Sequence, residues 1–501
     1  MSAWAGGYVA DVEYIAGYYR QQSPPHLMLA GLLGGVDSRP PRGSDTAHYV
    51  ELGCGHGMNA VLVAAANPAW QVTAIDYNPA HIAAGVALAQ AAGLVNITFL
   101  EADLGQFADS ARGAALPTAD VVSMHGVWSW VSPMVRAGII RLLAGLVAPG
   151  GLVHLSYNAL PAWQGGIGLQ RLIYEAGRRS GGRSDRQVSA GLECARALHA
   201  AEARHVRADP FAASLLDYAA EAAVGYLAHE YMNASWSPCF HADVAVAMAD
   251  AKLDWAASAN LLETFPDLML SEQQRVLLDR FDDPVMRELV KDMCLPRQLR
   301  HDTFVRGARR LSDFERDAAL KELTVALTVP AAEFVYELEV PAGQAELGPA
   351  FRPVVAALEN GPASIGALLA LVPGHSNPAE LSAVLVGTNQ AMVVPRPGAP
   401  QAAAADRLNR VLGHRIKTVA GPEPSGGLAS TALGTALPAT RLEQFVCARM
   451  LDGGNSDDSD IWFKQLSADI PEEKHDILRR MIRDVVTKRL PVLRNTGGLL
   501  F

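Results

Sequence analysis

The segment from Tyr49 to Gly57 combines an acidic residue with three closely spaced glycines. It reads Tyr-Val-Glu-Leu-Gly-Cys-Gly-His-Gly, so a short apolar strand ends near Glu51 and a Gly-x-Gly-x-Gly pattern follows. Glycine adopts positive φ readily and lets a ligand approach the backbone closely. In open α/β sheets, ligands bind beyond the carboxyl ends of the strands. The pattern therefore indicates a ligand site at Gly53, Gly55 and Gly57, the alternative being a tight turn.

Two more acidic residues stand where the next two predicted strands end. Asp76 ends the second strand, and Asp103 follows the third strand directly after Glu101 and Ala102. A carboxylate at Asp76 can accept hydrogen bonds from both hydroxyls of a ribose, and one at Asp103 can accept from an adenine amino group. Each acid alone is explained by a helix N-cap or a loop. Three in register indicate a nucleoside.

The position of Glu51 favours one nucleoside cofactor over another. NAD places a pyrophosphate on the helix N-terminus, usually with the spacing Gly-x-Gly-x-x-Gly. Here the spacing is Gly-x-Gly-x-Gly, and Glu51 would repel a pyrophosphate beside it. A sulfonium or an ammonium group would be attracted to the same carboxylate. S-adenosylmethionine carries both groups together with a ribose and an adenine, and it fits Glu51, Asp76 and Asp103 better.

Strands alternate with helices around these residues, which predicts an α/β fold with a doubly wound parallel sheet. Strands are predicted at 48–52, 71–75, 96–100, 121–124 and 152–157, with helices at 59–66, 79–92 and 134–147. A helix is also predicted from Tyr8 to Gly35, broken at Pro24-Pro25. A further helix and two strands are predicted at 242–251, 253–259 and 298–305. The strands of the sheet are therefore expected in two parts of the chain, the first before residue 164 and the second after about residue 240.

The rest of the chain divides by composition. We expect 1–164 to hold an N-terminal helical segment and the core, 165–235 a helical insertion, and 236–310 the completion of the core. A charged connector is expected at 311–345. Residues 346–501 are expected to form a separate unit, whose order of helix, helix, short strand and loop suggests a winged-helix-like domain.

These residues resemble the class I S-adenosylmethionine-dependent methyltransferases. The family's first motif matches Glu51 to Gly57, its ribose acid matches Asp76, and its adenine acid matches Asp103. The resemblance implies a seven-stranded sheet in which Gln298–Val305 is the antiparallel seventh strand. It further implies that Glu51 and the glycines hold the methionine end of the cofactor. The cofactor-binding residues it implies are Tyr19, Glu51, Gly53, Cys54, Gly55, Gly57, Asp76, Tyr77, Asp103, Leu104 and His125.

A narrower resemblance is to methyltransferases that carry a regulatory domain, among them bacterial lysine methyltransferases acting on outer-membrane proteins. Its motifs are Gly17–Arg20, His125–Trp130, Ser156–Asn158 with Pro161 and Trp163, and His229–Asn233. It implies that the helical insertion forms a homodimer. It also implies that the tyrosines at 14, 18 and 19 cover the cofactor, the alternative being packing on the core.

The acceptor is expected beyond the fourth and fifth strands. The candidate catalytic residues there are His125, Trp128, Tyr157, Asn158 and Trp163. Aromatic faces attract a cationic amine. A lysine acceptor must lose a proton, which costs about 4.6 kcal/mol at pH 7, and His125 is the hypothetical base with Asn158 orienting the amine. The alternatives are aromatic core anchors and a histidine bonded to backbone.

The expected function is methylation of a protein lysine or another amine. The alternatives are a small-molecule N- or O-methyltransferase and a regulatory protein that binds the cofactor without chemistry. About half of the chain is not needed to hold the cofactor, which favours a large substrate. The C-terminal basic residues are too few and too interspersed to predict a nucleic-acid partner.

Composition restricts the remaining classes. The chain has 501 residues, 50% hydrophobic residues and a net charge of −10, which excludes a disordered chain and disfavours nucleic-acid binding. No apolar run long enough to span a bilayer and no signal peptide is found. Five scattered cysteines indicate a reducing cytoplasm. Cys239 and His241 match no common zinc spacing, so no metal site is predicted.

Overall fold

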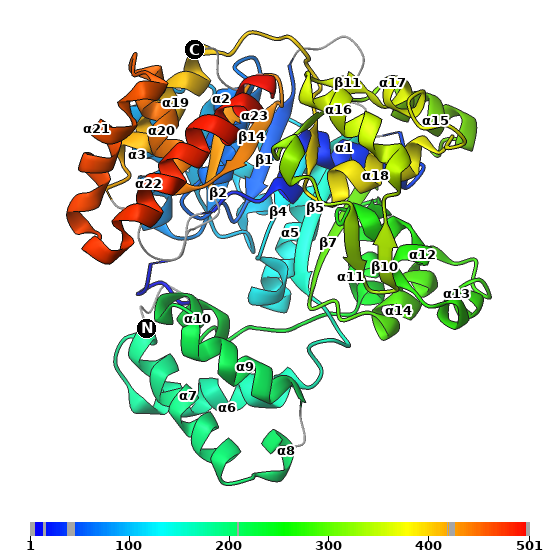
Figure 1. Cartoon of the computed structure of the whole chain (residues 1–501). Coiled ribbons are helices and arrows are strands. Elements are labelled where there is room, and N and C mark those ends of the chain that lie inside the picture. Colours follow the sequence, from blue (N-terminus) through cyan, green and yellow to red (C-terminus); the bar gives the residue numbers. More distant parts are fainter. Residues whose placement is uncertain are drawn as a thin grey trace.

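The structure is a computed structural model that describes residues 6–13, 17–37, 46–207, 210–417, 419 and 426–496. Figure 1 shows an α/β body from which a lobe of helices projects. Within the described ranges, no helix is long and apolar enough to cross a membrane.

A seven-stranded sheet forms the centre of the body. Its strands are β1 (His48–Leu52), β2 (Gln71–Asp76), β3 (Ile97–Glu101), β4 (Ala119–Met124), β5 (Val147–Asn158), β6 (Leu253–Ser258) and β7 (Leu299–Arg306). Their order is β3-β2-β1-β4-β5-β7-β6. Strands β1 to β5 pair in parallel, whereas β7 is antiparallel to both β5 and β6. The predicted seven-stranded fold with an antiparallel seventh strand is therefore confirmed.

Helices cover both faces of this sheet, as its largely buried strands require. The first group is α1 (Pro24–Leu33), α2 (Met58–Ala66) and α3 (Pro79–Ala91), and the second is α5 (Pro133–Leu146) and α11 (His241–Ala249). Ala60 and Val63 of α2 pack in one cluster with Val72 of β2. Ile139 of α5 packs with Val122 and Leu155 in a cluster on the other face. The short α4 (Ala111–Ala114) precedes β4.

The helical segment predicted from Tyr8 to Gly35, broken at residues 21–25, is confirmed only in its second half, because residues 8–13 and 17–19 form no helix. Helix α1 begins at Pro24, and the two prolines form its first turn instead of interrupting a longer helix. Proline suits this position because the first helical N–H groups have no partner inside the helix. Ser23 stands before them with extended backbone.

The residues predicted as a helical insertion form the projecting lobe (Figure 1). Its helices are α6 (Gly166–Ser180), α7 (Ser184–Ala200), α8 (Arg204–Arg207), α9 (Pro210–Glu221) and α10 (Val224–Tyr231). Ile173, Val188 and Leu192 are at the centre of the lobe's own apolar cluster. Val9 of the N-terminal segment is buried in the same cluster. The lobe therefore has a core separate from that of the sheet.

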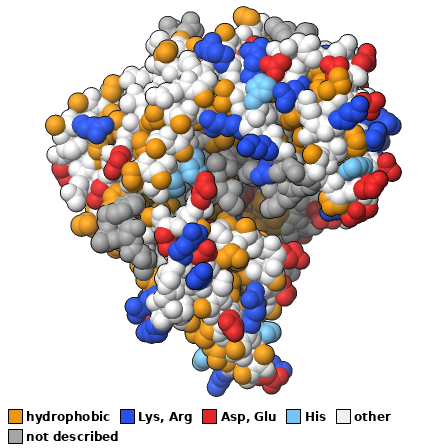
Figure 2. All heavy atoms as spheres, turned by 90° about the vertical axis from the view of Figure 1, so that its left-hand side faces the viewer, with side chains coloured by type: hydrophobic (Ala, Val, Ile, Leu, Met, Phe, Trp, Pro, Cys, Tyr) orange, Lys and Arg blue, Asp and Glu red, His pale blue; other side chains and the backbone are white. Residues whose placement is uncertain are grey.

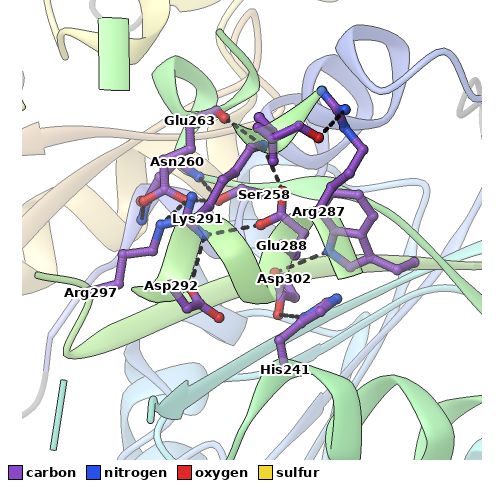
Figure 3. Close-up of polar contacts among 12 residues, drawn as sticks. His241, Ser258, Asn260, Glu263, Arg287, Glu288, Lys291, Asp292, Arg297 and Asp302 are labelled. Atoms are coloured by element: carbon purple, nitrogen blue, oxygen red, sulfur yellow. Dashed lines mark hydrogen bonds and ion pairs between the residues drawn. The ribbon is translucent and has the colours of Figure 1, made fainter. Parts of the chain in front are cut away.

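The segment between β6 and β7 is fixed to the sheet by buried charges. It holds α12 (Pro266–Met269), α13 (Glu272–Leu278) and α14 (Pro284–Cys294). Glu288 of α14 accepts hydrogen bonds from Arg297 at 3.0 Å and from Arg300 of β7 at 2.9 Å. Asp292 also accepts from Arg300 at 2.7 Å. Figure 3 shows Glu288, Asp292 and Arg297 of this charge cluster. Breaking one partner of such a buried network is strongly destabilising.

The prediction of a connector at 311–345 is wrong. Helix α15 (Asp313–Glu322) and strand β8 (Thr324–Leu327) belong to that range, followed by the hairpin of β9 (Glu337–Val340) and β10 (Gly343–Glu346). Strand β8 is the centre of a sheet with β11 (Ala363–Ser364) and β12 (Ala391–Val393). The sequence did not reveal these elements for two reasons. Most residues of α15 are charged, so its buried Ala319 and Leu320 do not stand out as an apolar face. Strand β8 has four residues, too few for an alternation of apolar and polar residues to be recognised.

The prediction that 346–501 is a separate unit is also wrong. Its first part holds α16 (Arg352–Glu359), α17 (Ile365–Leu369) and α18 (Pro378–Gly387), whose core includes Leu29 and Leu33 of α1. Its second part holds α19 (Ala403–His414), β13 (Gly426–Ser430), β14 (Thr435–Ala439), α20 (Arg441–Leu451), α21 (Ser459–Leu466), α22 (His475–Asp484) and α23 (Leu490–Asn495). Arg407 of α19 donates to the carbonyl of Ala92 at 3.0 Å. Both parts pack against helices of the core, and the winged-helix assignment stays a prediction.

Candidate active site

The loop after β1 has a shape that favours glycine. Gly53, Gly55 and Gly57 have φ of +72°, +52° and +73°. A Cβ at Gly53 would lie 2.3 Å from Cγ2 of Val127, and one at Gly57 would lie 2.4 Å from Cε1 of Phe99. Both contacts are impossible, so the glycines are required for packing as well as for backbone conformation.

Glu51 is a buried carboxyl at the end of β1, only 4% exposed. Nδ2 of Asn59 donates to its Oε2 at 3.4 Å, and Oδ1 of Asn59 is itself buried without a partner. Burial raises the pKa of Glu51 to about 8, and Asp76 adds to the rise. A buried carboxyl in this state gains strongly from a cation placed beside it.

Asp76 and Asp103 are positioned by backbone N–H groups. The N–H of Gly55 donates to Oδ2 of Asp76 at 2.8 Å, which links the end of β2 to the glycine loop. Oδ1 of Asp76 accepts a hydrogen bond from the N–H of Asn78 at 2.8 Å. The N–H of Gly105 donates to Oδ1 of Asp103 at 2.8 Å. These bonds hold both carboxylates at the edge of the sheet where β1, β2 and β3 end.

A cavity of about 310 Å³ lies at this edge, within the usual size range of small-molecule sites. Figure 2 shows the surface hollowed between the helical lobe and the rest of the molecule. Gly57 does not line the cavity, because its place is in the packing against Phe99. The predicted cofactor-binding residues that do line it are Tyr19, Glu51, Gly53, Cys54, Gly55, Asp76, Tyr77, Asp103, Leu104 and His125.

His125 follows β4 and lies in the cavity wall with its ring centroid 4.1 Å from that of Tyr19. Its Nδ1 lies 2.8 Å from Oγ of Ser156. Behind it, His301 stacks on it with ring centroids 5.4 Å apart. Burial and the nearby His301 lower the pKa of His125 to about 3. So weak a base argues against the predicted proton-accepting role and leaves His125 as a neutral wall residue.

Trp128 and Tyr157 do not line the cavity, so their predicted catalytic roles are wrong. Trp128 is buried in the apolar cluster on the α5 face, and the guanidinium of Arg136 lies 5.5 Å from its ring centroid. Tyr157 is buried, and its hydroxyl donates to Oδ2 of Asp302 at 2.6 Å. Oδ2 of Asp302 also lies 3.1 Å from Nδ1 of His241 (Figure 3). Tyr157 therefore belongs to the buried charge cluster and not to a reaction site.

Asn158 and Trp163 also lie outside the cavity wall, and the prediction of acceptor contacts by them is wrong. Oδ1 of Asn158 accepts from Nε1 of Trp236 at 3.2 Å. Nε1 of Trp163 donates to the carbonyl of Gln298 at 2.9 Å, and its ring lies edge-on to Trp236 with centroids 5.2 Å apart. The two residues hold the junction between β5 and the helical lobe.

Several residues of the wall were not among the candidate site residues, although Trp130 stands in the loop where the acceptor was expected. Trp130 lines the cavity although Trp128, two residues earlier, points into the core. The lobe contributes His229, Glu230 and Asn233 to the opposite wall. The motif at 229–233 was visible in the sequence as part of the family resemblance, but nothing in it showed which site it joins.

The N-terminal tyrosines lie in different places relative to the cavity. Tyr19 lines the cavity, as does Tyr8. Tyr18 is buried and donates to the carbonyl of Ala436 at 2.7 Å, so its predicted covering role is wrong. Tyr14 lies outside the described residues.

Cys239 and His241 belong to different surroundings. Sγ of Cys239 lies 3.4 Å from the carbonyl of Ser237, whereas His241 contacts Asp302. In the described part of the chain, no group of three or more His, Cys, Asp or Glu side chains is arranged to hold a metal ion.

Comparison with known proteins identifies the family. A methyltransferase domain model matches residues 50–153, and a model described as predicted methyltransferase regulatory domain matches residues 223–306. An uncharacterized protein of Synechocystis sp. is 34% identical over 366 residues, covering 73% of this chain and 71% of its own. The chain belongs to the class I S-adenosylmethionine-dependent methyltransferases with a regulatory domain. In this methyltransferase the two matched segments supply β1 to β5 and β6 to β7 of one sheet.

Solved structures extend the likeness of this methyltransferase to nearly the whole fold. PKMT2 from Rickettsia typhi matches with a TM-score of 0.68 and, in complex with AdoHcy, with 0.69. Identity is 17%, and each match covers 97% of this chain and 99% of PKMT2. An uncharacterized protein of Rickettsia prowazekii is 29% identical over 160 residues, 30% of this chain and 58% of its own. The likeness to PKMT2 shows a shared arrangement that includes the lobe and the C-terminal elements.

Proposed function

We propose that this methyltransferase methylates the side-chain amine of a lysine in a protein. The charge of the cavity carries the proposal. Among its described lining residues are the carboxyl groups of Glu51, Asp76, Asp103 and Glu230, and none of those lining residues is Lys or Arg. Such a wall attracts a cationic acceptor and repels an anionic one. A lysine ammonium group is the cation that a protein substrate offers.

Three of the carboxyls suit the cofactor. When bound, S-adenosylmethionine supplies a methyl group activated by a positive sulfonium. Glu51 would hold the ammonium of its methionine end, because a cation there relieves the buried carboxyl. Asp76 would accept from the ribose hydroxyls and Asp103 from the adenine amino group, with Leu104 against the ring. The glycine loop lets the ligand lie against the backbone.

The aromatic residues of the wall suit an amine. Trp130 and Tyr19 both line the cavity, and aromatic faces attract ammonium groups. His125 is neutral because burial lowers its pKa to about 3. A neutral ring can pack beside a cationic acceptor without repelling it, and together the rings exclude water from the acceptor nitrogen.

The size of the molecule supports a protein substrate. The helical lobe, which projects from the body (Figure 1), contributes His229 and Glu230 to the wall of the cavity. PKMT2 shares the fold over nearly the whole chain. We also propose that the lobe forms a homodimer, because it exposes large apolar side chains. These are Ile167, Tyr218 and Val224. Light scattering of the purified protein tests this, and a monomer would contradict it.

The proposal is tested with a cofactor carrying a radioactive methyl group. Purified protein and labelled cofactor are added to a bacterial lysate, and proteins are separated from small solutes. We expect label in protein bands, recovered as methyllysine after acid hydrolysis. Glu51→Gln is the inactive control. Label only in small solutes would instead support a small-molecule methyltransferase, and tight cofactor binding with no transfer would support a cofactor-sensing protein.

A further inference from the structure

Glu230 lies in the wall that the helical lobe contributes to the cavity. It is half-buried on α10, and the residues around it are tied to the N-terminal segment. Nε2 of His229 lies 2.9 Å from the carbonyl of Val12. Oδ1 of Asn233 accepts from the N–H of Val9 at 2.8 Å. These contacts hold this end of the lobe, and Glu230 with it, at the edge of the cavity.

The charges of the cavity distinguish Glu230 from the other carboxyls. Glu51, Asp76 and Asp103 stand at the carboxyl ends of β1, β2 and β3, and the cofactor accounts for all three under the proposed function. Glu230 comes from the opposite wall, and no lysine or arginine appears among the described residues that line the cavity. A half-buried carboxylate gains from a cation beside it. The acceptor is the cation that the proposed function supplies.

We propose that Glu230 binds the ammonium group of the acceptor lysine and takes its proton before methyl transfer. This inference rests on the proposed function. One N–H bond of the ammonium breaks, its electron pair stays on nitrogen, and the proton moves to a carboxylate oxygen of Glu230. The freed pair forms the N–C bond to the methyl group as the C–S bond of the cofactor breaks, with its electron pair left on sulfur.

The surroundings of Glu230 suit this role. Burial raises the pKa of Glu230 to about 7, and a hydrogen bond with Tyr226 opposes the rise. A base with a pKa near the working pH is the most effective. The other titratable groups near it are Tyr231 on its own helix and His229, whose pKa is lowered by burial. Neither of them is a cation at neutral pH that would hold Glu230 permanently ionised.

The kinetic test compares Glu230→Gln with Glu221→Gln, an exposed residue of the same lobe. A general base contributes about 10² to 10⁴ in rate. We expect Glu230→Gln to lower kcat/KM at pH 7 by at least 100-fold, with cofactor affinity within twofold of wild type. The loss should shrink as the pH approaches 10, because the acceptor then supplies its own free amine. Glu221→Gln should keep the wild-type profile.

A binding test reads the same contact without turnover. With S-adenosylhomocysteine bound, Nα-acetyl-lysine amide and its norleucine analogue are titrated at pH 8 by calorimetry. We expect wild type to prefer the lysine probe at least tenfold, Glu221→Gln to keep this preference, and Glu230→Gln to lose it. Glu230→Ala, with its thermal melt, provides a second variant if Glu230→Gln does not fold.

The outcomes separate the two proposals. Methyllysine formation by wild type, together with an unchanged pH profile and lysine preference in Glu230→Gln, would overturn the role of Glu230 and leave the proposed function standing. Absence of methyllysine with wild type would overturn both, whereas equal binding of the lysine and norleucine probes by wild type would overturn the role of Glu230 alone.

Discussion

The hydroxyl of Tyr157 donates a 2.6 Å hydrogen bond to Oδ2 of Asp302, joining β5 to the antiparallel β7 inside the sheet. Asp302 is fully buried, and Arg300 on the same strand donates to both of its oxygens, at 2.9 and 3.1 Å. Arg300 and the nearby His241 lower the pKa of Asp302. A residue that seemed from the sequence to meet the acceptor thus stabilises a buried carboxylate behind the active site.

Tyr157→Phe should therefore destabilise the fold without changing cofactor binding. Removing one hydrogen bond to a buried charge costs about 1.5–3 kcal/mol. Urea unfolding at pH 7 measures the loss, and cofactor titration provides the comparison. A weaker cofactor affinity with unchanged stability would contradict the structural role.

Glu51→Gln should abolish cofactor binding and stabilise the unliganded protein at high pH. The pKa of Glu51 is about 8 in the folded protein, against 4.5 when unfolded, so wild-type stability falls as the pH rises from about 4.5 to 8. The neutral glutamine lacks this effect. The free energy of unfolding of Glu51→Gln should therefore exceed that of wild type by about 3–5 kcal/mol above pH 8. Urea unfolding of both proteins at pH 5 and pH 8 checks it, and an equal difference at both pH values would refute the idea.

Four buried histidines, one in the cavity wall and three outside it, should make the fold acid-sensitive. The pKa values of His26 and His125 are lowered to about 3, that of His301 to about 4, and that of His154 is lowered well below 6.5, all chiefly by burial. The unfolded chain binds these protons below about pH 6.5, so stability is lost as the pH falls through that value.

Each of these histidines should lower the free energy of unfolding by about 2 kcal/mol at pH 5. His301→Gln tests this, because it removes one of them and should weaken the dependence on pH between 7 and 5 by about that amount. His205→Gln, on the exposed α8, is the matched control. Identical pH slopes for wild type and His301→Gln would show that the cluster is not the cause.

Gly53→Ala should weaken cofactor binding and lower stability together. The residue has φ of +72°, and a Cβ would lie 2.3 Å from Cγ2 of Val127. Overpacking and backbone strain of this kind cost about 1–3 kcal/mol each. The control is Gly145→Ala in α5, where a Cβ meets nothing within 4 Å and should be neutral or stabilising. Thermal melts and cofactor titration measure both, and a stable Gly53→Ala protein with full affinity would contradict the prediction.

Trp130→Ala should impair the acceptor step more than the cofactor step. Its ring lines the cavity and lies 6.3 Å from that of Trp236, near the lobe. Losing the contact between an aromatic face and an ammonium group weakens binding by about 1–2 kcal/mol. This corresponds to a rise of about five- to thirtyfold in the KM for a lysine peptide. Trp128→Phe, in the core, should lower stability and leave that KM unchanged. Equal effects of the two variants on KM would count against the assignment.

The sequence by itself determined the sheet and the cofactor side of the site. Apolar strands that alternate with helices pair in parallel, and residues that end such strands must meet at one edge. Glu51, Asp76 and Asp103 could therefore be grouped from the sequence, and the glycine pattern after Glu51 marked the ligand side. The antiparallel β7 followed from family resemblance, because no local pattern gives strand direction.

Only the tertiary structure decided the acceptor side. Trp128 and Trp130 are two residues apart in one short turn, yet the first packs in the core and the second lines the cavity. Glu230 reaches the site because the lobe that carries α10 lines the same cavity as strand ends far away in the sequence. The direction of a loop side chain and the docking of a lobe depend on packing between distant segments. The spacing of apolar residues in the sequence shows which face of a helix or strand is buried, but not which other segment packs against that face.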